Sequence, residues 1–271
     1  MSLRSDAETT PRYNPMDAIL ARQVGLDAVR HGPAASALVT GPESSMGTEK
    51  PVPPSPADLL TGGDAVALAA GAARISGSRA KRGFDLGAAL LGLAFLAPLL
   101  LVLGLIIRLE TPGPALFKQR RTGRDGQTFT IYKFRTMRVI EDGTEIVQAA
   151  ENDQRTTRLG RFLRRSSIDE LPQLLNVLQG EMSLIGPRPH ALAHDAYYGA
   201  RVPGYDARFL VRPGLSGLAQ VKGCRGATPE TEMMAERVRW DLTYIETWSL
   251  ALEARIFLDT VRVFFFHPTS Y

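Results

Sequence analysis

The sequence predicts a helix-rich α/β fold, in which a re-entrant membrane helix-break-helix is followed by a compact domain with a short strand segment. Residues 86–107 form a run of 22 residues without a charge. Residues 129–137 alternate as a β-strand does, and capped helical patterns fill the C-terminal part. We divide the chain into an arm (1–78), a membrane helix (79–110), a polar domain (111–266) and a short tail (267–271).

The arm is expected to be mostly disordered. Residues 1–58 hold 8 of the 18 prolines and no sustained apolar run. Two alanine-rich stretches, 16–30 and 57–74, predict weak helices that either dock on a partner or remain in solvent. The solvated tail is the favoured reading.

The charge of the chain is concentrated after the arm. The formal net charge is +4, and residues 1–78 carry 6 Lys and Arg against 8 Asp and Glu, which leaves 26 against 20 for the remainder. A basic domain suits anionic partners: phosphorylated substrates, acidic lipid headgroups or nucleic acid. The single cysteine, Cys224, excludes a disulfide within the chain and suits a reducing compartment.

The apolar run is long enough to cross a bilayer, because 22 helical residues extend for about 33 Å. Pro98 lies near its middle, where a proline removes a helix hydrogen bond and favours a kink or break. Basic residues flank both sides: Arg79, Lys81 and Arg82 before the run, and Arg108, Lys118, Arg120 and Arg121 after it.

Positively charged flanks are typical of the cytoplasmic side of a membrane. Both flanks satisfy this rule only if the helix enters the bilayer, bends at Pro98 and leaves through the same leaflet. A spanning helix with a harmless kink is the alternative. We predict Lys81 and Arg82 as interface anchors and place the polar domain on the cytoplasmic face of the membrane.

The predicted strand over 129–137 places Lys133 and Arg135 on one face, since side chains alternate with a period of two. Two cations held together on a rigid strand are suited to clamp a diphosphate or an anionic lipid headgroup. Solvated surface charges are the alternative reading.

Asp169 and Glu170 form an acidic pair in a basic setting. Pro172 indicates a helix that starts near Asp169 and runs to about residue 178, because proline is tolerated in the first turn. Ser167 and Glu170 also have capping-box spacing, so Glu170 has a purely structural alternative role.

The surroundings of this pair favour chemistry. A helix N-terminus attracts anions, and three arginines precede the pair: Arg161, Arg164 and Arg165. Nearby positive charge is expected to lower the pKa of a carboxylate and keep it ionised. One acid then serves as nucleophile and the other as a ligand of Mg²⁺, while Arg188, between two prolines, holds a phosphoryl group in a bidentate fork.

An ordered series of motifs over about residues 79–266 resembles the bacterial sugar transferases, the monotopic phosphoglycosyl transferases. The series comprises Lys81-Arg82-Gly83-Phe84-Asp85-Leu86, the Pro112-Gly113-Pro114 turn, the strand 132–137, Asp169-Glu170-Leu171-Pro172-Gln173 and Ile185-Gly186-Pro187-Arg188-Pro189. Motifs over 188–194, 213–226 and 237–250 are similar to the branch that initiates exopolysaccharide or capsule synthesis. Lys222, Cys224 and Glu253 depart from the family pattern.

This resemblance implies an EC 2.7.8-class reaction: transfer of a hexose-1-phosphate from a UDP-sugar to undecaprenyl phosphate, with release of UMP. Asp169 would carry a covalent phosphosugar and Glu170 would bind Mg²⁺. The implied substrate-binding residues are Lys133, Arg135, Arg165, Arg188 and Arg225. Glucose is favoured over galactose, a homodimer is common among relatives, and inner-membrane lipid and other glycan-pathway enzymes are expected partners.

Two other classes of protein fit the basic domain less well. A membrane-tethered nucleic-acid or regulatory binding protein would not need Asp169 and Glu170 beside Arg188, so we expect no nucleic-acid partner. A non-catalytic scaffold of a glycan-assembly complex, with the arm as its working part, is the second alternative.

Overall fold

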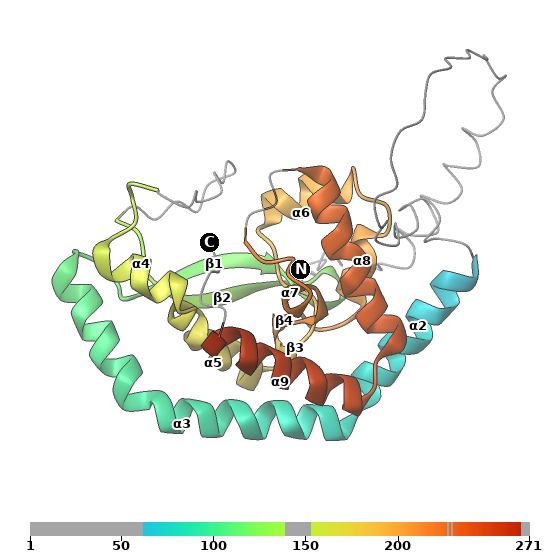
Figure 1. Ribbon diagram of the computed structural model, residues 1–271, viewed down its shortest axis with the longest axis horizontal. Coiled ribbons are helices and arrows are strands. Elements are labelled where there is room, and N and C mark those ends of the chain that lie inside the picture. The colour runs from blue at the N-terminus through green and yellow to red at the C-terminus, as the bar shows by residue number, and fades with distance from the viewer. Residues whose placement is uncertain (1–61, 139–152, 227, 229, 267–271) are drawn as a thin grey trace, which may run out of the picture.

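The structure, a computed structural model, describes residues 62–138, 153–226, 228 and 230–266, apart from the side chains of 263–266. Helices surround two small two-stranded sheets (Figure 1). The first half contains α2 (Gly62–Gly77), α3 (Arg79–Glu110), β1 (Leu116–Thr122), η1 (Arg124–Gly126), β2 (Thr128–Phe134), α4 (Arg158–Arg165) and η2 (Ile168–Gln173). The second half contains α5 (Leu174–Gln179), β3 (Ser183–Ile185), α6 (Leu192–Gly199), η3 (Tyr205–Leu210), β4 (Gly214–Ser216), α7 (Leu218–Val221), α8 (Thr231–Thr247) and α9 (Leu250–Phe266).

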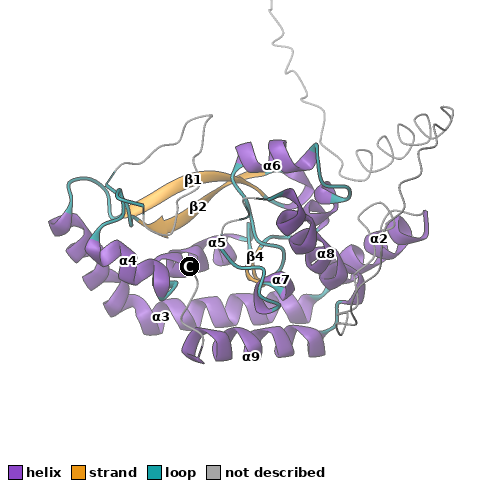
Figure 2. Cartoon of the chain, turned by 45° about the horizontal axis from the view of Figure 1, so that its top comes forward, coloured by secondary structure: helices purple, strands orange, loops and turns teal. Residues whose placement is uncertain are grey.

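The predicted helix-rich α/β character is confirmed, with one long apolar helix and little sheet. Strands β1 and β2 pair as an antiparallel hairpin, with Gln119 opposite Ile131, and β3 pairs with β4 in parallel. Strand β2 ends at Phe134, before the predicted end at 137. In both views α5 lies between this hairpin and α3 (Figures 1 and 2).

Helix α3 is the one described helix that is long and apolar enough to cross a membrane, and only 11% of its most apolar 18-residue stretch is buried. Phe95 is 85% exposed and Leu101 is 75% exposed. The predicted break at Pro98 is wrong, because the helix is continuous over 32 residues. The kink that was the other expectation for Pro98 agrees with the bend about midway along α3 (Figure 1), since one lost hydrogen bond is compatible with a kink. Passage in and out through one leaflet stays a prediction.

The two predicted interface anchors are bound inside the protein. Lys81 is 6% exposed, and its Nζ lies 2.8 Å from Oε1 of Glu253 and 3.1 Å from the Ile185 carbonyl oxygen. Arg82 donates to the Val177 carbonyl, at 2.9 Å, near the end of α5. This prediction is therefore wrong for Lys81 and Arg82: the first turn of α3 fastens the apolar helix to the polar domain.

Helix α2 overlaps the weak helix predicted over 57–74, and the favoured reading that this stretch remains in solvent is wrong. Leu68 is completely buried in the main core, and Gly71 meets α8 so closely that a Cβ there would lie 2.1 Å from the Ile245 carbonyl oxygen. Arg74 donates to the Glu246 carbonyl at 2.7 Å. The end of the arm therefore docks on α8. The expectations for residues 1–61, including the stretch 16–30, lie outside the described residues.

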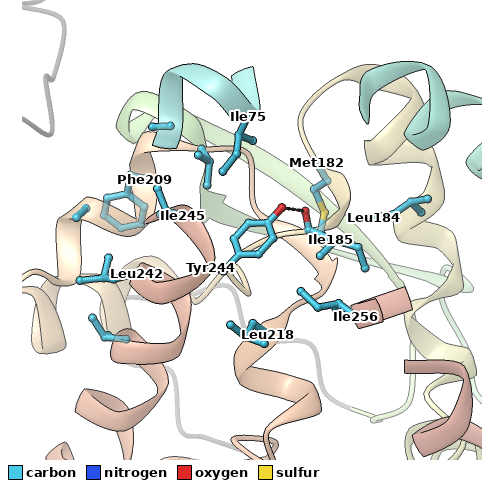
Figure 3. Packing of buried hydrophobic residues seen from close by; sticks show 14 of the residues in the cluster. Ile75, Met182, Leu184, Ile185, Phe209, Leu218, Leu242, Tyr244, Ile245 and Ile256 are labelled. Carbon is cyan, nitrogen blue, oxygen red and sulfur yellow. Dashed lines mark hydrogen bonds between the residues drawn. The ribbon is translucent and has the colours of Figure 1, made fainter. Parts of the chain in front are cut away.

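The main core lies between α2, α5, α8, α9 and the short parallel sheet (Figure 3). The predicted apolar face of α8 is confirmed, because Met234, Val238, Leu242 and Ile245 are each at most 2% exposed. Tyr244 on the same helix donates from its hydroxyl to the Ile185 carbonyl at 3.1 Å. These contacts hold β3, and so the segment that follows it, against α8.

Candidate active site

The acidic pair lies on a tight 3₁₀ turn, η2, that runs directly into α5. Ser167 precedes it in the left-handed region with φ of 53°, and its side chain caps nothing. The capping-box role for Glu170 is therefore wrong. The predicted end of the helix is confirmed, because Gly180 terminates α5 with φ of 86°.

Glu170 is held by cations from two other elements. Lys133 of β2 donates to Oε1 at 2.7 Å. Arg188 donates to Oε2 at 3.0 Å and to Oε1 at 2.5 Å, the bidentate geometry expected of a guanidinium and a carboxylate. Burial by itself would raise the pKa of Glu170, but the charges of Arg188 and Lys133 outweigh it and hold the pKa well below its usual range.

Asp169 is in the opposite state. It is 9% exposed, and burial raises its pKa to about 7, with the adjacent charge of Glu170 adding to the rise. Lys133, Arg164 and Arg188 act in the other direction without cancelling it. The expectation that surrounding arginines keep this pKa low is therefore wrong for Asp169, because Glu170 takes the two closest cations.

Arg188 is fixed through its main chain by a residue that the sequence reasoning missed. Arg208 of η3 donates to the Arg188 carbonyl at 2.6 Å and to Oδ2 of Asp241 at 2.8 Å. Both side chains of the Arg208–Asp241 pair are 2% exposed. An arginine and an aspartate 33 positions apart give no local pattern, so only the packing of η3 on α8 identifies them.

The remaining predicted cations divide into two groups. Arg225 lies in the neighbourhood of the pair: burial and then the charge of Arg188 lower its pKa, while Glu170 opposes this. Arg165 is exposed at the end of α4, and among the described residues it makes no hydrogen bond to the acidic pair. Arg164 acts electrostatically on Asp169 in its place.

Arg135 does not join Lys133. It is 5% exposed and donates to the carbonyls of Ile107, Thr111 and Pro112 at the end of α3. The main chain of Arg135 still pairs with Ala115, but its guanidinium is held by these carbonyls and does not reach Glu170 as Lys133 does. Its assignment as a substrate-binding residue is therefore wrong, and its role is to cap α3.

The acidic pair fits a magnesium ion only if phosphate oxygens of a ligand complete the coordination shell of the ion. Among the described residues no group of three or more His, Cys, Asp or Glu side chains is placed to hold a metal. Mg²⁺ commonly takes one or two carboxylates plus phosphate oxygens and water. Oε1 of Glu170 accepts from both Lys133 and Arg188, whereas Oε2 accepts from Arg188 and keeps a further lone pair. His190 offers no alternative, because its Nδ1 lies 2.7 Å from the Tyr205 hydroxyl.

These features define a class: a membrane-associated protein in which a buried aspartate lies beside an ion-paired glutamate and several arginines, at a site suited to phosphorylated ligands. A family model for the bacterial sugar transferases matches residues 76–267. The chain belongs to this family, and the prediction that it is a transferase is confirmed.

Its relatives have related names. The UDP-glucose:undecaprenyl-phosphate glucose-1-phosphate transferase of Caulobacter vibrioides is 56% identical over 188 residues, 69% of this chain and 70% of that protein. The protein of the same name from Escherichia coli is 44% identical over 191 residues, 70% of this chain and 41% of that protein. The exopolysaccharide production protein PSS of Rhizobium leguminosarum is 45% identical over 185 residues, 67% of this chain and 92% of that protein. The match thus spans less than half of the Escherichia coli relative.

Proposed function

We propose that the protein transfers glucose-1-phosphate from UDP-glucose to undecaprenyl phosphate on the cytoplasmic face of the membrane and thereby initiates an exopolysaccharide. The names of the relatives support the donor and the acceptor. The observation that carries the proposal is the division of the acidic pair into a paired Glu170 and an unpaired, buried Asp169.

In the first step an Asp169 carboxylate oxygen bonds to the β-phosphorus of the UDP-sugar. The bond from that phosphorus to the bridging oxygen breaks, and UMP leaves with this oxygen. In the second step an oxygen of undecaprenyl phosphate bonds to the same phosphorus. The bond to Asp169 then breaks, which restores the carboxylate and releases the lipid diphosphate sugar.

The surrounding residues support this chemistry by positioning and charge, which phosphoryl transfer requires more than proton movement. Asp169 has little hydration, and although Lys133, Arg164 and Arg188 act on its charge, none of the described cations forms a salt bridge with it, so its oxygens are free to attack. Lys133 and Arg188 neutralise charge beside it. Glu170 would hold Mg²⁺, which when bound offsets the charge of the diphosphate.

A non-catalytic scaffold is the competing function. It would need neither a desolvated Asp169, whose burial costs folding free energy, nor an Arg188 held in place by Arg208 beside the acidic pair. The same argument applies to a nucleic-acid binding protein, for which exposed cations would suffice.

The test is UMP release by the purified full chain with UDP-glucose, Mg²⁺ and undecaprenyl phosphate. We expect turnover. We also expect mass spectrometry to detect a sugar-phosphate adduct on Asp169 when the lipid is omitted. Asp169→Asn should retain its fold and lose both signals. Product formation by Asp169→Asn would exclude Asp169 as the nucleophile. A panel of UDP-sugars then tests the choice of glucose.

The topology has its own test. Single cysteines at Ser78 and Thr111, which flank α3, are labelled from outside the cell in a Cys224→Ser background. A re-entrant helix leaves both cysteines unlabelled until the membrane is permeabilised. Labelling of only one of them in intact cells would show that α3 spans the bilayer.

A further inference from the structure

Guanidinium groups crowd around the segment Arg188–Ala191, which links β3 to α6. Arg208 lies 3.2 Å from Nδ1 of His190 and also binds the Arg188 carbonyl. Arg237 of α8 approaches Nε2 of His190 at 3.3 Å. Arg121 pairs through its main chain with Ala191, and β1 reaches the segment from the hairpin side (Figures 1 and 2).

Two of these cations lack a carboxylate partner. Arg188 is paired with Glu170, and Arg208 is paired with Asp241. Among the described residues, no carboxylate lies within 4 Å of a guanidinium nitrogen of Arg121 or Arg237. Buried charges are ordinarily paired, so the segment is short of negative charge.

The same two residues carry buried donors without a partner. Among the described residues the enclosed Nε atoms of Arg121 and Arg237 make no hydrogen bond, and Arg237 is 4% exposed. Another nitrogen of each guanidinium is bound, since Arg121 donates to Oε1 of Gln119 and Arg237 donates to the Gly226 carbonyl. Burial, and next the charge of Arg188, lower the pKa of each to about 10. His190 lies between them and adds no charge of its own, because burial and the charge of Arg208 lower its pKa well below the usual value.

We propose that Arg121 and Arg237, which meet the His190–Ala191 segment from β1 and α8, form a subsite for a phosphate monoester beside the Arg188–Glu170 pair. A phosphate dianion supplies the missing negative charge and accepts from the N–H groups of Arg121 and Arg237 that Gln119, Gly226 and His190 leave free. UMP and a polyprenyl phosphate are both phosphate monoesters, so both sources share this chemistry.

Arg135 provides a matched control. It is also buried with an unpartnered Nε, but its other nitrogens bind three carbonyl oxygens at the end of α3. The carbonyl dipoles of a helix end are a negative environment, and no excess of positive charge arises there. An unpartnered Nε alone therefore does not indicate a phosphate site. The crowding of arginines is what distinguishes the subsite from the surroundings of Arg135.

The inference rests on the proposed function for its ligands, but it is tested by binding alone. The full chain in detergent, with EDTA present, is titrated by calorimetry with UMP, uridine and a short-chain polyprenyl phosphate. We expect Arg121→Gln and Arg237→Gln each to weaken the binding of at least one phosphate monoester tenfold or more, with partial recovery in Arg237→Lys. Arg135→Gln should bind as the wild type does, and uridine should bind far more weakly than UMP.

The outcomes separate the two proposals. Loss of UMP binding assigns the subsite to the nucleotide, and loss of polyprenyl phosphate binding assigns it to the lipid. Loss of both shows that the two ligands occupy the same subsite one after the other. Unchanged affinity for both ligands in the folded Gln variants overturns the subsite, even if turnover is normal. If Arg237→Gln does not fold, the less deeply buried Arg121 decides the question. Absence of turnover and adduct in wild-type protein instead refutes the proposed function and leaves the binding result intact.

Discussion

Glu170 and Glu253 are both buried glutamates with a lysine Nζ less than 3 Å away, yet their surroundings differ. Oε1 of Glu253 accepts from Lys81 at 2.8 Å, from the indole of Trp248 at 2.8 Å and from the Tyr244 hydroxyl. Glu170 is held by two cations and has an ionisable neighbour, Asp169, that no cation satisfies. The Lys81–Glu253 pair is balanced in charge and holds α3 to the domain, with Asp85 as a second carboxylate 3.9 Å from Lys81. Glu170 instead faces two cations, and its cluster keeps capacity for a ligand.

The largest expected effect is on turnover in Glu170→Gln. The variant removes the charge that Arg188 and Lys133 hold in place, and we expect UMP release to fall by a factor on the order of 10³. Because both cations are partly exposed, the free energy of unfolding should change little. Glu253→Gln is the matched change, and its turnover per folded molecule should stay close to wild type. Equal losses in the two variants would remove the functional distinction between the clusters.

Glu253→Ala should give the largest loss of stability. It leaves Lys81 buried without its closest carboxylate, since Asp85 lies at 3.9 Å. Removal of one partner of a buried pair typically costs about 3–5 kcal/mol. Denaturant unfolding in detergent measures the loss, with the exposed Glu232→Ala on α8 as control. A loss below 1 kcal/mol would show that the balanced cluster does not hold α3.

Asp169→Asn should stabilise the protein, in contrast to its effect on catalysis. The folded pKa of about 7 lies above the unfolded value near 4, so the ionised carboxylate destabilises the fold as pH rises from about 4 to 7. A neutral amide removes this cost, which amounts to at most about 4 kcal/mol. The melting temperature with EDTA present should therefore rise at pH 8 and change little at pH 4. A gain at pH 4 equal to that at pH 8 would contradict the buried-charge explanation.

The smallest effect is expected for Tyr244→Phe. The lost hydroxyl shares its one proton between Glu253 and the Ile185 carbonyl, but Lys81 and Trp248 still donate to the carboxylate. One hydrogen bond contributes about 0.5–1.5 kcal/mol. Thermal unfolding measures the change, and turnover should be retained. A loss as large as that in Glu253→Ala would show that the cluster depends on this hydroxyl and not on charge balance.

Several parts of the fold were predictable because their signals are local. The apolar run gave α3, the 3.6-residue period gave the buried face of α8, and Gly180 marked the end of α5. The strand alternation gave most of β2, but β1 was missed because its charged residues conceal the pattern. Lys81 was misassigned because a basic residue beside a membrane helix looks the same whether it contacts headgroups or a buried glutamate on α9.

The sequence alone determined the acidic pair, Arg188 between its prolines and the apolar helix, because each is a short pattern whose chemistry is carried by adjacent residues. Only the tertiary structure decided how the two acids differ. Which carboxylate receives the cations depends on the approach of Lys133 and Arg188 from separate elements, and desolvation of Asp169 depends on everything packed around it. The same holds for Arg121 and Arg237, since 116 positions separate two cations whose significance arises from sharing one buried space.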